Sequence, residues 1–172
     1  QYLTDGIWRF DLTILNKSLG TAALFLVALS MFLTGVAFFS RGSSRPLAYR
    51  KYYGLAGFWT ALVHGLVNHF GLPAAGLHAE RKLDALLSDG PGLAALVLFG
   101  VMAALSNAAA KGRLGGEIWR KTLRYGGYAA LALALAHTAL LKGASWGKFF
   151  RTFDPVLPSL SLPAAVFAAA AV

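Results

Sequence analysis

The stretch from Ser18 to Ser40 decides the fold class, and it reads SLGTAALFLVALSMFLTGVAFFS. It holds no charged side chain and is flanked by Lys17 and Arg41. A bilayer core about 30 Å thick is crossed by a helix of roughly 20 apolar residues. A helix also satisfies its own backbone polar groups in lipid, which an isolated strand does not. The stretch therefore predicts a membrane-spanning helix.

The composition of the whole chain agrees with this interpretation. Of its 172 residues, 57% are hydrophobic and only 13% are charged, and the mean hydropathy is +0.59. Soluble domains carry about 25% charged residues, so the values exclude a disordered chain, a coiled coil and an ordinary soluble enzyme. The absence of cysteine excludes disulfides, cysteine-ligated zinc and iron–sulfur clusters.

Four further apolar stretches follow, which gives five expected spans in a single domain covering residues 1–172. The expected spans are 18–40, 52–72, 90–110, 125–142 and 156–172. The third opens with Asp89, Gly90 and Pro91, a helix-start signal. The predicted fold class is all-α, a polytopic transmembrane helical bundle with short loops.

The basic residues indicate an orientation. Nine of them fall between the first and second spans or between the third and fourth, and seven fall on the other side. By the positive-inside rule the side with nine is cytoplasmic and the N-terminus lies outside. Topology thus accounts for most of the net charge of +9, and no nucleic-acid partner is expected.

Two histidines within the expected spans are the main functional candidates, since ionisable side chains inside a membrane helix are costly and commonly functional. His64 lies 14 residues after Arg50, and His137 lies 13 residues after Arg124. At 1.5 Å per residue, each is roughly 20 Å from the cytoplasmic end of its helix. The two imidazoles are therefore expected at similar depth, where they could hold one metal or one haem iron between two helices.

Small side chains precede each histidine on the same helix face, at positions seven and three residues before it: Gly57 and Ala61, and Ala130 and Ala134. They could leave a slot for a flat macrocycle, although Thr60 and Leu133 at four residues before are bulkier. The alternative is ordinary packing, because small residues are common at membrane helix contacts. Zinc is less favoured, since it wants four ligands and no Cys, Asp or Glu is expected at that depth.

The other two histidines receive weaker interpretations. His69 points about 140° away from His64, so a structural or haem-propionate contact is expected there. His78 follows Pro73 and is expected in a solvated loop.

A family resemblance rests on short motifs in a fixed order. RKYYGL at 50–55 and ALVH at 61–64, followed by RLGG at 113–116, Trp119, Tyr128 and His137, resemble ferric-reductase-like transmembrane domains. The most similar member type is the haem-binding membrane subunit of the bacterial periplasmic methionine sulfoxide reductase system. The resemblance covers roughly residues 20–142. It implies a six-helix b-type cytochrome of the inner membrane, with one helix expected before Gln1.

The resemblance makes His64 and His137 the axial ligands of haem iron. Where the family carries a further histidine, this chain has Arg124, so one bis-histidine haem b is expected rather than two. The implied activity is electron transfer to other subunits of a membrane or periplasmic redox complex, and no catalytic residue is predicted. Arg50, Lys51 or Arg124 could neutralise a quinone, a flavin or a propionate at the cytoplasmic side, or could simply anchor the topology.

Two other functions stay open. The chain could be a non-redox structural or assembly subunit that has lost haem. It could also be a proton or small-solute transporter that uses His64 and His137 as a relay, although no Asp or Glu falls within the expected spans.

Overall fold

The computed structural model describes residues 11–39, 45–77, 83–152 and 160–171, and every regular element there is helical. The elements are α1 (Leu12–Phe39), α2 (Arg45–Leu66), the π-helical turn η1 (Val67–Gly71), α3 (Leu72–Ala74), α4 (Leu83–Leu105), α5 (Ala108–Leu114), α6 (Gly116–Thr152) and α7 (Ser161–Ala170). The prediction of an all-helical fold is confirmed for these residues.

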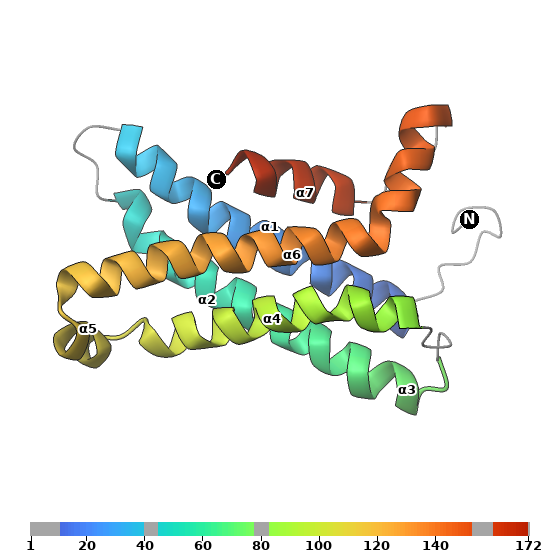
Figure 1. Cartoon of the computed structure of the whole chain (residues 1–172), viewed down its shortest axis with the longest axis horizontal. Helices are drawn as coiled ribbons and strands as arrows, with labels where there is room; N and C mark the ends of the chain where they lie inside the picture. The colour runs from blue at the N-terminus through green and yellow to red at the C-terminus, as the bar shows by residue number, and fades with distance from the viewer. Residues whose placement is uncertain (1–10, 40–44, 78–82, 153–159, 172) are drawn as a thin grey trace.

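Four long helices, α1, α2, α4 and α6, run side by side along the long axis of the molecule (Figure 1). The most extensive packing joins α1 with α2 and α4 with α6, and smaller contacts join α2 with α4 and α1 with α6. This neighbour order places α2 and α6 at opposite corners of the bundle. The two helices that carry His64 and His137 are therefore related by a diagonal.

The buried core is built largely from small side chains. Ala28, Ala130 and Ala168 are fully buried, and Leu131 is the largest side chain with no exposed surface. Small residues let helix backbones approach closely, which is the usual way that helices associate in lipid. Gly57 on α2 shows the same principle, because a Cβ there would lie 2.7 Å from Cγ2 of Val27 on α1.

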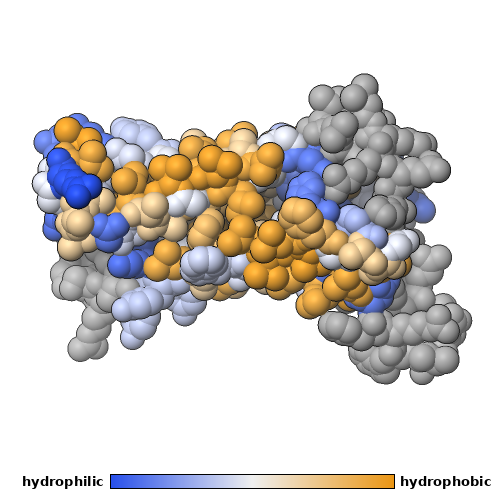
Figure 2. Space-filling model, turned by 90° about the horizontal axis from the view of Figure 1, so that it is seen from below, coloured by the Kyte–Doolittle hydropathy of each residue, from blue (hydrophilic) through white to orange (hydrophobic). Residues whose placement is uncertain are grey.

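Large apolar side chains instead cover much of the outside. Trp59 is 59% exposed, Val97 58% and Leu140 62%. Figure 2 shows hydrophobic side chains across the middle of one face, with hydrophilic ones gathered toward the ends. Such a surface is unfavourable in water and suits a lipid environment.

By length and composition, two described helical segments could cross a membrane, Leu12–Ala37 and Gly116–Thr152. A third is reached if Asp89–Leu105 and Ala108–Leu114 form one broken span. Fewer spans are thus found than the five expected. The helix at the expected span 52–72 starts at Arg45 and continues into the π-helical turn, and its basic first turns lower its apolar character.

The expected span 90–110 is broken by a sharp bend. The axes of α4 and α5 differ by 89°. At the break, Ser106 Oγ donates to the carbonyl of Met102 at 2.8 Å, and Asn107 Oδ1 caps α5 by accepting from Ala110 N at 2.8 Å. These polar side chains replace helical hydrogen bonds with local ones, which ends α4. The expected start is also wrong, since α4 begins at Leu83 and contains Pro91.

The expected span 156–172 contains a helix that is too short to cross a bilayer. α7 has ten residues, or about 15 Å of helix, roughly half of the hydrocarbon thickness. It packs on α1 and α6, with Ala164, Ala165 and Ala168 buried. Residues 156–159 and 172 lie outside the described part of the chain.

Replacing Gly57 by alanine is expected to destabilise the bundle. The new methyl would overlap Val27, and overpacking of this kind costs about 1–3 kcal/mol. Gly143→Ala on α6 is the matched control, because its Cβ would meet no atom within 4 Å. Thermal unfolding in detergent should give a lower Tm for Gly57→Ala only, and equal Tm values would contradict the close approach of α1 and α2.

Candidate functional site

His64 lies near the end of α2 with its ring against Gly20 of α1. A Cβ at Gly20 would be 3.0 Å from Cε1 and 3.2 Å from Nε2 of the ring, so glycine leaves the space that the imidazole occupies. His64 Nδ1 lies 2.9 Å from the carbonyl oxygen of Asn16. A carbonyl only accepts, so Nδ1 donates the hydrogen and Nε2 keeps its lone pair. Metal-binding histidines commonly have this arrangement, in which the second nitrogen is fixed by a carbonyl.

His137 has a matching environment on α6. Its ring packs on Gly92 of α4, where a Cβ would lie 2.8 Å from Nδ1 and 2.9 Å from Cε1. Each histidine thus rests on a glycine of the helix that packs most closely against its own. The two imidazoles are near enough for their charges to interact. The structure therefore brings together the two residues that the sequence singled out.

A carboxylate also lies near this pair, which was not expected. Asp89 interacts electrostatically with His64. The signal was its position three residues before Gly92, which puts both on one face of α4. Even so, no group of three or more His, Cys, Asp or Glu side chains is positioned to hold a metal ion within the described ranges. The site suits a group that needs two imidazoles.

A polar contact next to His64 was also missed by sequence reasoning. Asn16 is only 5% exposed, and its Nδ2 donates to Asn68 Oδ1 at 3.4 Å. Asn16 Oδ1 is buried without a hydrogen-bond partner in the part of the chain that the structure describes. Asn68 and His69 both lie on the π-helical turn, a feature that often marks functional sites. His78 lies outside the described residues.

The small residues before the histidines have a different use from the expected slot. Gly57 contacts α1 through Val27, and Ala130 is fully buried in the core. Ala134 packs against the same core. Helix packing therefore accounts for these positions, which was the alternative interpretation, and the glycines that make room for the imidazoles are Gly20 and Gly92.

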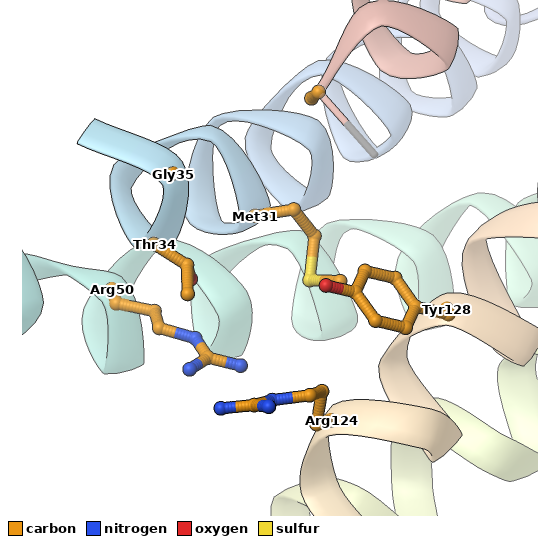
Figure 3. A pocket seen from close by; sticks show the side chains of 7 residues that line it. Met31, Thr34, Gly35, Arg50, Arg124 and Tyr128 are labelled. Atoms are coloured by element: carbon orange, nitrogen blue, oxygen red, sulfur yellow. The ribbon is translucent and has the colours of Figure 1, made fainter. Parts of the chain in front are cut away.

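The basic residues expected at the other end of the bundle do converge. Arg50 on α2 and Arg124 on α6 point toward one another (Figure 3), and both line a cavity of about 250 Å³. A neighbouring cavity of about 530 Å³ shares these two arginines and adds Lys51. Arg50 precedes the expected span 52–72. Burial lowers its pKa, Tyr128 opposes this lowering, and the Arg124 cation adds to it.

Comparison with protein-family models found no match for this chain, and comparison with curated proteins found none either. The functional argument therefore rests on the geometry of the two ends of the bundle.

Replacing Gly92 by alanine is expected to displace the His137 ring. The methyl would lie under 3.0 Å from three ring atoms, so the variant should lose about 1–3 kcal/mol of stability, as for other overpacked sites. Gly90→Ala, two residues earlier on α4, is the matched control, since its Cβ would meet nothing within 4 Å. Thermal unfolding compares the two variants, and an unchanged Tm for Gly92→Ala would place the His137 ring elsewhere.

Proposed function

We propose that the chain is a membrane-embedded b-type cytochrome subunit that holds one haem between His64 and His137 and passes electrons to a partner protein. The observation that carries this proposal is the hydrogen bond from His64 Nδ1 to the Asn16 carbonyl, which leaves Nε2 available for iron. The second ligand, His137, lies nearby on the diagonally opposite helix. In helical bundles, cofactor sites are built from side chains on facing helices.

The residues at this end fit such a group. Two imidazoles, with no third ligand group among the described residues, match the ligand set of a bis-histidine haem better than that of zinc. When bound, haem would supply reversible one-electron chemistry with no open coordination position. Gly20 and Gly92 position the imidazoles, and the Asn16 carbonyl fixes the orientation of the His64 ring.

The cellular setting belongs to the same proposal. The resemblance to ferric-reductase-like transmembrane domains suggests a polytopic protein of the bacterial inner membrane, with the N-terminus outside. Its partners would then be lipid and other subunits of a membrane or periplasmic redox complex. The chain would act as the electron-transfer subunit of an oxidoreductase system rather than as a stand-alone enzyme. A quinone or a flavin at the arginine end is compatible with this role.

One observation favours a second candidate, a structural or assembly subunit without haem. Gly57 and Ala130, whose small size could have indicated a cofactor slot, are used in helix packing. The alanine-rich core and the apolar outside would also suit packing against larger membrane partners. Bound haem distinguishes the two candidates.

Absorption spectra of the detergent-purified protein test the proposal. We expect a low-spin b-type spectrum in the oxidised and dithionite-reduced states, and about one haem per chain by pyridine haemochrome assay. His64→Ala and His137→Ala should each lose the spectrum, because each removes an axial ligand. His69→Ala is the matched control, since His69 is exposed on the π-helical turn and should leave the spectrum unchanged.

Two results would overturn parts of the proposal. A colourless protein that still folds would leave the structural subunit as the better interpretation. Two haems per chain would show that further residues or a partner supply ligands, contrary to the expectation based on Arg124.

A further inference from the structure

The arginine end of the bundle has the features of a binding site in its own right. Arg50 and Arg124 come from diagonally opposite helices and line both cavities there. The larger cavity is also lined by three lysine or arginine side chains from the surrounding helices, Lys51, Lys111 and Arg120. Five cations therefore border one space of about 530 Å³, a volume typical of small-molecule sites.

No carboxylate of the described residues lines either cavity. Glu117, the acidic residue nearest in sequence to these cations, pairs with Lys121 at 2.8 Å on an exposed surface. Asp89 interacts with His64 instead. The segment 40–44, which joins α1 to α2, contains no acidic residue in its sequence. The converging cations are thus not neutralised by the chain.

Like charges that face one another in a partly buried space repel, and an anion between them would relieve that repulsion. Guanidinium groups bind phosphate oxygens through paired, charge-assisted hydrogen bonds. Tyr128 and Ser106 add hydroxyl groups to the linings. The polar side of the space therefore matches an oxyanion, and a phosphate group in particular.

The inner wall of the larger cavity is apolar. Phe58, Phe99 and Met102 line it beside the cations. A free inorganic ion would leave this wall without contacts, whereas a molecule with an apolar part would cover it. The ligand should therefore be amphiphilic.

We propose that this end of the bundle binds a phosphate-bearing amphiphile, with its phosphate between Arg50 and Arg124 and its apolar part against Phe58, Phe99 and Met102. Two sources share this chemistry, an anionic phospholipid and a water-soluble phosphate ester with an apolar group. The site does not depend on haem, because it lies 13 or 14 residues from the histidines along each helix.

Thermal unfolding in an uncharged detergent at constant ionic strength tests the proposal. The probes are phosphatidylglycerol, with phosphatidylcholine as its zwitterionic control, and hexyl phosphate, with hexanol as its uncharged control. We expect a saturable rise in Tm of several degrees with at least one phosphate probe and none with its control. Stabilisation by phosphatidylglycerol alone assigns the lipid source, and stabilisation by hexyl phosphate assigns the soluble ester.

Variants separate binding from folding. Arg50→Gln combined with Arg124→Gln should abolish the rise in Tm, while its Tm without any probe should equal or exceed that of the unmodified protein because the repulsion is removed. Arg113→Gln is the matched control, since Arg113 is exposed on α5 and lines neither cavity. The proposal is overturned if no phosphate probe raises the Tm, or if the double variant responds as the unmodified protein does.

Discussion

The contact of each imidazole with a glycine is the constraint on which the site depends. His64 lies on Gly20 and His137 lies on Gly92, and in both cases a single methyl would meet the ring at about van der Waals distance or closer. These contacts are possible because α1 packs closely on α2 and α4 on α6. The same close packing lets the Asn16 carbonyl accept the His64 hydrogen bond. Helix packing and ring orientation are therefore one property of the bundle.

The two ends of α2 and α6 present different chemistry to the interior. Each helix carries an arginine and, 13 or 14 residues later, a histidine. Since the two helices are diagonal neighbours, both pairs face the middle of the bundle. One end offers neutral nitrogen ligands beside small residues, and the other offers converging cations beside apolar side chains. Spacing along two helices thus sets up two separate binding proposals.

Much of this arrangement could be predicted from the sequence. The uncharged run at 18–40 predicts a long apolar helix, and the equal spacing of Arg50–His64 and Arg124–His137 predicts two levels of paired side chains. Three features could not be read in this way. The break at Ser106 and Asn107 depends on side chains that bond to nearby backbone, and the short α7 depends on packing against α1 and α6. Asn16 and Asp89 approach His64 from other helices, and single-helix patterns do not report such contacts.

The central claim is that His64 and His137 together fill both axial positions of one haem iron, and electron paramagnetic resonance of the oxidised protein tests it most directly. The account predicts a low-spin ferric signal, together with a reduced spectrum that carbon monoxide does not change, because two imidazoles leave no open position. A high-spin signal, carbon monoxide binding, or a folded protein that takes up no haem would contradict it.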